Sequence, residues 1–300
     1  MKILITGGTG LIGQAFIRQF DDHQFTVLTR SISGSDAMWP ASVSFIESLD
    51  ILQNLDEFDA VINLAGEPII DKRWSPEQKH VICQSRWLLT QQLVALFALS
   101  QKPPAVFLSG SATGVYGDRG AEQVSEASPV EIGGFSTQLC LNWEKIAMQA
   151  EPHTRVVLLR TGIVLSTQGG ALTKMLVPFK CFLGGRIGYG EQYMSWIHYQ
   201  DHINAMHYIL LEKSILGPVN LVAPQAQKNT TFTHTLAQSL NRLAVLPMPK
   251  KILQLVLGES SCLLLDSQKV VPQKLLESGF KFKFPTLKSA LHDLLISTQD

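Results

Sequence analysis

The sequence predicts an α/β fold: a doubly wound parallel sheet with a smaller, mostly helical C-terminal lobe. Two observations indicate the sheet. Short runs rich in β-branched residues alternate with helical segments through the first half of the chain. These runs are apolar throughout, as expected of parallel strands that helices cover on both faces. A third observation indicates the lobe: the loop-rich stretch from Gly184 to Gly190 and the short helical segments near the C-terminus.

Seven apolar runs are predicted strands, and the last is expected to rejoin the main sheet: residues 2–6, 25–29, 43–47, 60–63, 105–109, 156–160 and 219–222. Predicted helices cover residues 11–20, 75–100 and 135–151. Residues 195–198 indicate a further strand that leads into a helix at Asp201, whose side chain is well placed to cap that helix. From Thr231 onward we expect short helices, with residues 280–284 as the exception.

The turn between the first strand and the first helix carries the sharpest functional signal. Residues 7–13 read GGTGLIG, which satisfies G-x-G-x-x-G between an apolar strand and an amphipathic helix, the context that this motif requires. Glycines allow a tight turn and a close approach to a diphosphate, and free N–H groups at the helix N-terminus attract the phosphates. We therefore predict a Rossmann-like dinucleotide site, with these candidate cofactor-binding residues: Gly7, Thr9, Gly10, Leu11, Ile12 and Gly13.

The end of the second strand indicates which dinucleotide binds. An acidic residue there would bond the ribose 2′-hydroxyl of NAD, whereas a basic residue accommodates the 2′-phosphate of NADP. The strand is followed by Arg30 and Ser31, with no acid. NADP(H) is therefore favoured over NAD(H), with a merely solvated arginine as the alternative. After the fourth strand, residues Leu64, Ala65 and Gly66 are expected to leave room for the same cofactor.

Several motifs resemble one known family. They are GGTGLIG at 7–13, NLAG at 63–66, SGSATGVYG at 109–117, SWIHYQD at 195–201, NLVAP at 220–224 and the tail from Leu257-Gly258-Glu259 through Pro272 to residues 279–282. The chain resembles the extended and atypical short-chain dehydrogenase/reductases, and most closely the bacterial "epimerase family" proteins with a C-terminal domain of unknown function. The resemblance implies an NADP(H)-binding oxidoreductase or epimerase-like protein acting on a small substrate, nucleotide-sugar-like compounds among the candidates.

The usual acid–base pair of that superfamily is missing. Its members combine a strand-end Ser or Thr with Tyr-x-x-x-Lys, in which lysine lowers the pKa of the tyrosine that exchanges a proton with substrate. None of the five tyrosines here precedes a lysine by four residues. At the strand end Ser111 is the first catalytic candidate and Thr113 the second, although either hydroxyl can instead bond the backbone. Glu144 on the third helix is a further acid–base candidate, with a helix-surface ion pair as the alternative.

The missing pair leaves two function classes open. One is an enzyme in which Ser111 orients a substrate oxygen; the other is a non-catalytic NADP(H)-binding sensor or scaffold. By resemblance, the segment containing Arg186, Gln192 and Trp196 faces the substrate, and Arg186 is suited to grip a phosphate or carboxylate unless it forms a surface salt bridge.

Three other chemistries are disfavoured by the residues. His198, Asp201 and His202 form H-x-x-D-H, but no complementary cluster of ligands is evident elsewhere, so we expect no metal site. A serine hydrolase is disfavoured because Ala112 occupies the position of the elbow serine. We interpret Cys140 as a buried structural thiol rather than a nucleophile.

Composition and charge exclude further classes. Twenty-five basic residues balance 25 acidic ones, so we expect neither nucleic acid nor membrane as partner. The most apolar stretch, residues 93–99, is far shorter than the roughly 20 residues of a membrane span. The chain becomes glycine-rich too early for a signal peptide, and its four scattered cysteines suggest a reducing compartment. We expect a cytoplasmic monomer or homodimer with a small-molecule substrate.

The motifs also suggest how the chain is divided. Residues 1–165 plus 191–223 are expected to form the NADP-binding Rossmann domain. Residues 166–190 plus 224–300 are expected to form the substrate-side lobe, which includes the C-terminal family domain.

Overall fold

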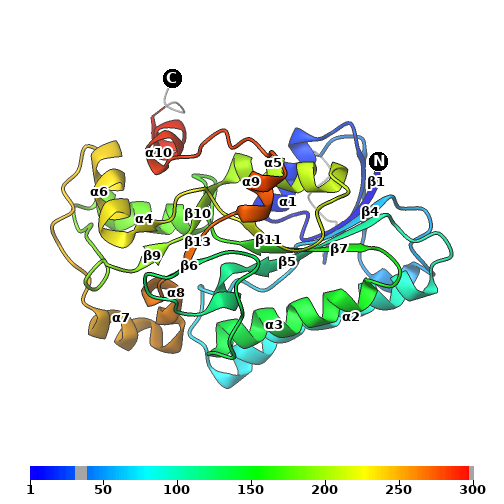
Figure 1. Ribbon diagram of the computed structural model, residues 1–300, viewed down its shortest axis with the longest axis horizontal. Coiled ribbons are helices and arrows are strands. Elements are labelled where there is room, and N and C mark those ends of the chain that lie inside the picture. The colour runs from blue at the N-terminus through cyan, green and yellow to red at the C-terminus, as the bar shows by residue number, and fades with distance from the viewer. Residues whose placement is uncertain (31–38, 297–300) are drawn as a thin grey trace.

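A parallel sheet of seven strands forms the centre of the computed structural model, which describes residues 1–30 and 39–296 (Figure 1). The strand order is β3-β2-β1-β4-β5-β7-β11, and every neighbouring pair is parallel. This order confirms the doubly wound prediction and the return of the last strand. The chain changes direction between β1 and β4, so a crevice opens there at the carboxyl ends of the strands. The strand bounds are β1 (Lys2–Thr6), β2 (Gln24–Leu28), β3 (Val43–Ile46), β4 (Ala60–Asn63), β5 (Val106–Ala112), β7 (Arg155–Thr161) and β11 (Gly217–Leu221).

Helices cover both faces of the sheet. In Figure 1, α1 (Leu11–Gln19) and α5 (Tyr199–Leu211) lie on one face, and α2 (Pro76–Leu99) and α3 (Phe135–Ala147) lie on the other. Alternate residues of β1 enter the two cores: Ile3 and Ile5 pack with Phe16 of α1, whereas Leu4 packs with Phe97 of α2. The strands lack polar alternation because both of their faces are buried. Within the described ranges, no helix has both the length and the apolar character needed to span a membrane.

Helix starts follow local capping chemistry, with one departure from prediction. Ser75 caps α2 by accepting a hydrogen bond from the Gln78 N–H at 3.2 Å, as its position before Pro76 favours. The prediction that Asp201 caps the next helix is wrong. Helix α5 begins two residues earlier, and His198 Nδ1 accepts from the Gln200 N–H at 3.1 Å. Asp201 therefore lies inside the first turn of the helix.

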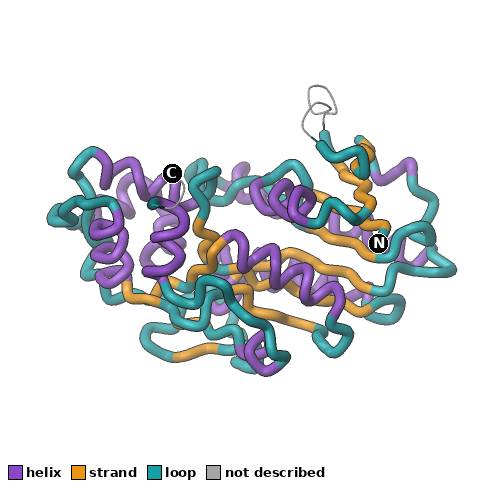
Figure 2. The backbone as a smooth tube through the Cα atoms, turned by 90° about the horizontal axis from the view of Figure 1, so that it is seen from above, coloured by secondary structure: helices purple, strands orange, loops and turns teal. Residues whose placement is uncertain are grey.

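The second half of the chain adds a lobe at one end of the sheet, where Figure 1 places α4, α6 and α10. Figure 2 shows a group of helices at the same end, beside the C-terminus. Three helices pack around a separate apolar core that includes Leu172 of α4 (Ala171–Lys180), Phe232 of α6 (Asn229–Ser239) and Leu291 of α10 (Leu287–Leu295). Trp196 lies fully buried in this core. Short strands edge the lobe, in three pairs: β8 (Ile163–Leu165) with β10 (Trp196–His198), β9 (Tyr193–Met194) with β12 (Gln227–Lys228), and β6 (Gln123–Val124) with β13 (Lys269–Val270).

The C-terminal segment packs against both cores. Leu275 in α9 (Gln273–Glu277) and Phe280 belong to the core of the sheet, whereas Phe284 belongs to the core of the lobe. Where the chain passes from one core to the other, both oxygens of Asp201 accept backbone hydrogen bonds at 2.8 Å, from the N–H groups of Lys283 and Phe284. The remaining elements are α7 (Lys250–Leu257), α8 (Cys262–Leu265) and the 3₁₀ turns η2 (Leu49–Ile51), η3 (Thr113–Tyr116), η4 (Met148–Ala150) and η5 (Gly258–Ser261).

Candidate cofactor site and active site

The turn between β1 and α1 has the shape of a diphosphate cradle. Gly7 has a φ of +70°, and a Cβ on Gly13 would lie 2.4 Å from the Gly7 carbonyl oxygen, so larger residues do not fit either position. The first intrahelical bond runs from the Gln14 N–H to the Gly10 carbonyl at 2.9 Å. In the described structure no protein group accepts from the N–H groups of residues 11–13, which therefore point free donors at the crevice. These residues fit a bound dinucleotide.

A buried chain of hydrogen bonds fixes the strand ends beside this cradle. Thr6 Oγ1 donates to Asn63 Oδ1 at 2.6 Å, and Asn63 Nδ2 donates to Thr90 Oγ1 at 2.9 Å. The Trp143 indole N–H donates to the same hydroxyl at 2.9 Å. The Ala65 N–H bonds to Thr6 Oγ1 at 3.3 Å. The segment of residues 64–66 is therefore held against β1, α2 and α3.

One cavity of about 310 Å³ joins the cradle to the end of β5. It brings several predicted site residues together, because Gly7, Gly10, Gly13 and Leu64 line it along with Ser111. Residues from α2, α3, β7 and α5 close the other sides. The full lining is Gly7, Gly10, Leu11, Ile12, Gly13, Leu64, Ile69, Arg86, Gly110, Ser111, Ala112, Leu139, Cys140, Trp143, Thr161 and His202.

Ser111 is bonded to a buried ion pair. Its hydroxyl donates to Glu144 Oε1 at 2.6 Å. Arg160 Nε and Nη2 donate to Glu144 Oε1 and Oε2, each at 2.8 Å, which is the bidentate geometry of a strong pair. Ser111 and Arg160 are cross-strand partners on β5 and β7, so the register of the sheet places them side by side. Ser111, Glu144 and Arg160 are all less than 8% exposed.

The network continues away from the cavity through Arg160. Its Nη1 donates to Tyr116 Oη at 3.0 Å, and Tyr116 donates to Asn220 Oδ1 at 2.8 Å. Burial disfavours the Arg160 cation, but the bonds and charge of Glu144 outweigh burial and raise the pKa of Arg160. Burial raises the pKa of Tyr116 despite the neighbouring guanidinium. Arg160 therefore stays charged and Tyr116 stays a neutral phenol at physiological pH.

Two other titratable side chains line the cavity in their neutral forms. Burial, together with the charge of Glu144, raises the pKa of the Cys140 thiol to about 12, so it is not a ready nucleophile, in line with the interpretation as a structural thiol. His202 lies in a fully buried position, and burial lowers its pKa to about 3. His202 Nε2 is 3.0 Å from Thr161 Oγ1, whereas Nδ1 has no hydrogen-bond partner within the described residues.

Arg86 and Trp143 form a stacked pair across the cavity wall. The Arg86 Cζ lies 5.4 Å from the Trp143 ring centroid. Glycines flank the pair on both sides: a Cβ on Gly66 would lie 2.7 Å from Arg86 Cζ, and a Cβ on Gly110 would lie 2.6 Å from the Trp143 ring. The glycines that follow β4 and interrupt β5 therefore make room for this pair.

The other predicted cofactor and catalytic residues do not line the cavity. Arg30 is exposed just beyond the carboxyl end of β2, and Ser31 after it falls outside the described residues. Thr9 is exposed, and its carbonyl accepts from the Gln14 side chain at 2.7 Å. Thr113 is buried at the start of η3 and does not line the cavity, unlike Ser111.

The three predicted substrate residues are not brought together with Ser111. Arg186 lines a different pocket of about 580 Å³ on the lobe, with Thr230, His234 and Arg242. Gln192 bonds to the carbonyls of Ile187 and Leu264 at 3.2 and 3.1 Å. Trp196 is fully buried, and its N–H bonds to the Gln225 carbonyl at 3.1 Å, which makes it a packing residue. None of the three lines the cavity that contains Ser111, and their role toward a substrate stays a prediction from the resemblance.

The three side chains of the H-x-x-D-H motif make contacts with different parts of the structure and do not converge. His198 caps α5 with one nitrogen and has the other 3.2 Å from an Asp293 carboxylate oxygen. Asp201 holds the C-terminal segment, and His202 contacts Thr161. No cluster of three metal-type ligands occurs in residues 1–30 and 39–296.

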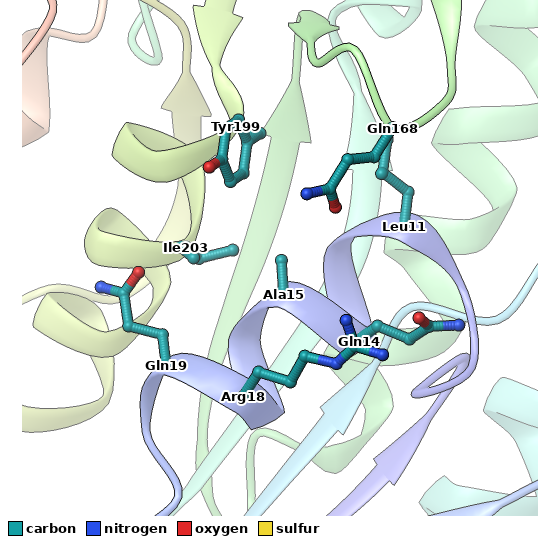
Figure 3. Close-up of a pocket in the computed structure, with 8 residues that line it drawn as sticks. All are labelled: Leu11, Gln14, Ala15, Arg18, Gln19, Gln168, Tyr199 and Ile203. Carbon is teal, nitrogen blue, oxygen red and sulfur yellow. The ribbon is translucent and has the colours of Figure 1, made fainter. Parts of the chain in front are cut away.

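A second depression, of about 520 Å³, lies between α1 and α5 (Figure 3). The figure shows Ala15 and Ile203 between the two helices, with Arg18 and Gln14 on the α1 side and Tyr199 on the α5 side. Leu11 is shared with the cradle, but neither Ser111 nor any residue of β5 lines this depression. It therefore lies apart from the candidate chemistry.

Sequence reasoning missed Arg86 and Arg160, and it considered His202 only as a possible metal ligand, not as part of this cavity. A signal for Arg86 was available: Ile82, Arg86, Thr90 and Leu93 form one stripe of the long helix at spacings of three and four, and a charge on an otherwise buried stripe is unusual. Arg160 ends an apolar run and gave no comparable sign. It becomes a partner of Glu144 only through strand register.

Comparisons with known proteins agree with this geometry. Residues 3–243 match the NAD dependent epimerase/dehydratase family, and residues 248–294 match a domain of unknown function, DUF1731. An epimerase family protein of Staphylococcus aureus is 38% identical over 300 residues, covering 98% of this chain and 99% of the relative. The crystal structure of human epimerase family protein SDR39U1 (isoform 2) with NADPH is 32% identical, with a TM-score of 0.90 over 98% of this chain and 99% of that one.

A third protein is more distant. The nucleoside-diphosphate sugar epimerase from Corynebacterium glutamicum is 28% identical, with a TM-score of 0.77 over 98% of this chain and 58% of that chain. The glycine cradle, the sheet order and the C-terminal domain thus occur together in one chain that resembles these relatives along nearly its whole length. The chain belongs to the NAD dependent epimerase/dehydratase family, with an appended DUF1731 domain, as its motifs predicted.

Proposed function

We propose that the protein is an NADP(H)-dependent oxidoreductase or epimerase-like enzyme that acts on a small polar alcohol or carbonyl compound. The observation that carries the proposal is the single cavity that joins the glycine cradle to Ser111, with Ser111 bonded to the buried Glu144–Arg160 pair. When bound, the nicotinamide supplies or accepts the hydride. The protein itself contributes binding, orientation and a path for one proton.

The cofactor preference is proposed from Arg30. This exposed guanidinium follows β2, where the adenosine ribose of a dinucleotide lies in folds of this kind. No acidic residue stands in its place to select the unphosphorylated nucleotide. The human epimerase family protein was crystallised with NADPH, which supports the same preference. Gly7, residues 10–13 and residues 64–66 would hold the rest of the cofactor.

Ser111 would contact the reacting oxygen of the substrate. In the direction of alcohol oxidation, the substrate O–H proton passes to Ser111 Oγ while the Ser111 proton passes to Glu144 Oε1. A bound nicotinamide would take up the hydride from the carbon that carries this oxygen, which would leave a carbonyl group on the substrate. Arg160 holds Glu144 in place through both carboxylate oxygens. Ser111, Glu144 and Arg160 would together replace the missing Tyr-x-x-x-Lys pair. Ser111 would contact the substrate, and Arg160 would position Glu144.

The proposal is tested in two steps, binding first and turnover second. Calorimetry should give NADPH a lower Kd than NADH. A panel of sugar nucleotides and simple carbonyl compounds is then assayed for NADPH oxidation. For any compound that reacts, Ser111→Ala should lower kcat/KM by about 10²-fold or more while NADPH affinity changes less than about threefold.

A matched control lies two residues earlier on the same strand. Ser109 is also fully buried on β5, but its hydroxyl has no partner within the described residues and does not line the cavity. Ser109→Ala should leave kcat/KM unchanged. A loss of activity in both variants, or in neither, would contradict the role given to Ser111.

A second function class is favoured by one specific observation. Both oxygens of Glu144 are already bonded to Arg160, and no Tyr-x-x-x-Lys pair is present, so the chain also fits a cofactor-binding sensor or scaffold that has lost chemistry. That alternative predicts NADPH binding without consumption by any compound of the panel. Oxidation of NADPH by a natural metabolite would exclude it.

A further inference from the structure

Arg86 is a cation in the cavity wall that no carboxylate neutralises. Among residues 1–30 and 39–296, no carboxylate oxygen lies within 4 Å of it. Its bonds run to neutral oxygens: Nη1 donates to the Ile82 carbonyl at 3.1 Å, and Nη2 to the Glu67 carbonyl at 3.0 Å. The Glu67 carboxylate itself pairs with Lys72 at 3.4 Å. A guanidinium held in a partly buried place with no counter-ion is ready to bind an anion.

The guanidinium of Arg86 keeps free donors. In the described structure its Nε–H has no hydrogen-bond partner, and Nη2 uses one of its two hydrogens, on the Glu67 carbonyl. Arg160 of the same chain shows how Nε and Nη2 of an arginine together bind both oxygens of a carboxylate. Carboxylates and phosphates are the groups that such donors bind in parallel hydrogen bonds.

Neighbouring residues hold the Arg86 guanidinium in a defined position. The guanidinium lies over the Trp143 ring, and Gly66 leaves room for it, since a Cβ there would lie 2.7 Å from Arg86 Cζ. Trp143 is fixed in turn by its bond to Thr90 and by its packing on Gly110, beside Ser111. Burial lowers the pKa of Arg86, although the neighbouring Cys140, Cys83 and Glu67 oppose the shift.

We propose that Arg86 recognises a carboxylate or phosphate on the substrate while Ser111 contacts the reacting oxygen. The inference rests on the proposed function, because it treats the cavity as the active site, and it names the substrate class: a small carbonyl or hydroxyl compound that carries an anion. The glycine cradle, with its own free N–H groups on the α1 side of the cavity, serves the diphosphate of the cofactor. Arg86, on the α2 side with Trp143 and Cys140, is left for the substrate.

Matched probe pairs test the proposal without turnover. Dihydroxyacetone phosphate is compared with dihydroxyacetone, and pyruvate with pyruvamide, by ligand-observed NMR on protein saturated with NADP⁺. The wild type should bind the anionic member of at least one pair about tenfold more tightly or better. Arg86→Gln should reduce that preference to less than about twofold, and Arg86→Lys should retain part of it, since lysine keeps the charge without the fork.

The controls separate a local effect from a general one. Arg18 is an exposed arginine without a protein partner in the described chain, and it lies in the other depression (Figure 3). Arg18→Gln should behave as the wild type. If Arg86→Gln does not fold, Gly66→Ala is compared with the wild type in the absence of NADP⁺, because Gly66 also belongs to the proposed cofactor site. The alanine Cβ would displace the guanidinium while leaving the arginine present. It should also abolish the anion preference.

Three results would overturn the proposal. The first is no preference for either anionic probe in the wild type, and the second is a preference that survives in both Arg86→Gln and Gly66→Ala. The third is a roughly tenfold loss of NADP⁺ affinity in Arg86→Gln with the probe preference intact. The last would assign Arg86 to the cofactor phosphates. If NADP⁺ does not bind the wild type at all, the proposed function fails. The same NMR comparison on the free protein then still decides whether Arg86 binds an anion.

Discussion

The charge state of each buried side chain in this site depends on whether a charged partner offsets the cost of burial. Glu144 is buried with a guanidinium on both oxygens, whereas His202 is buried with one contact, to Thr161. A buried group without a charged partner keeps its neutral form. The two residues therefore differ in kind: Glu144 is held in an ion pair, and His202 is an imidazole that resists protonation.

His202 makes the fold sensitive to acid. Its pKa in the folded protein is about 3, below the ordinary value of 6.5, so only the unfolded chain takes up the proton as pH falls below 6.5. Above that pH the group contributes nothing; below it, folded stability is lost progressively until about pH 3. At pH 5 the loss from this residue is about 2 kcal/mol.

Urea unfolding at about pH 7.5 and about pH 5 measures this loss. His202→Leu should lose about 2 kcal/mol less than the wild type between the two pH values, and any packing defect of the variant cancels in that difference. The exposed His234 provides the control, since His234→Leu should keep the wild-type pH dependence. Equal losses in wild type and His202→Leu would show that the imidazole titrates normally.

At the scale of elements, the turn between β1 and α1 depends on backbone contacts that no side-chain movement can relieve. A Cβ on Gly13 would lie 2.4 Å from the Gly7 carbonyl oxygen and 2.6 Å from the Gly8 Cα. Gly13→Ala should therefore open the turn and weaken NADPH binding by about 100-fold or more in calorimetry. Gly10→Ala is the graded comparison, because its Cβ would meet only the Gly7 oxygen, at 3.2 Å, and should cost about tenfold or less. Equal effects would mean that the turn adapts freely.

The positions of helices and strands could be predicted where they depend on local sequence patterns. Strands buried on both faces read as continuous apolar runs, and the predicted strands 2–6 and 60–63 coincide with β1 and β4. The glycine motif could be located because its requirements are local. Helix α5 was placed two residues late, since its start depends on a histidine cap that has no strong sequence preference.

Contacts between elements were beyond prediction from one sequence. Glu144 was identified as a candidate, but its partner Arg160 lies on another element, and only the pairing of β5 with β7 brings Ser111 and Arg160 together. The segment with Arg186 and Trp196 was expected at the substrate because of the resemblance to the family, not from contacts that the sequence shows. The packing of the lobe, which is not encoded locally, turns those side chains elsewhere.

For the whole molecule, Asp201 joins the two cores. It lies on α5 beside the sheet, and its two oxygens hold the backbone of Lys283 and Phe284 at the point where the chain passes from the core of the sheet to the core of the lobe. Burial raises the pKa of this carboxyl, although the two N–H bonds oppose the shift. The cost of burying the Asp201 side chain is therefore only partly offset by these two hydrogen bonds.

Removing the carboxylate should loosen the lobe from the sheet. Asp201→Ala leaves two backbone donors without an acceptor, at about 1–3 kcal/mol each, partly offset by relief of the buried charge, for a net loss of about 2 kcal/mol in unfolding free energy. Asp201→Asn keeps one acceptor and should lose about half as much.

The readout is urea unfolding followed by tryptophan fluorescence and by circular dichroism. Both proteins carry phenylalanine in place of Trp39, Trp74, Trp87 and Trp143, so that Trp196 alone reports the lobe core, whereas most of the ellipticity comes from helices that pack on the sheet. The two probes should then coincide with Asp201 present and separate in Asp201→Ala. Coincident transitions at wild-type stability in Asp201→Ala would show that apolar packing of the C-terminal segment alone couples the two cores.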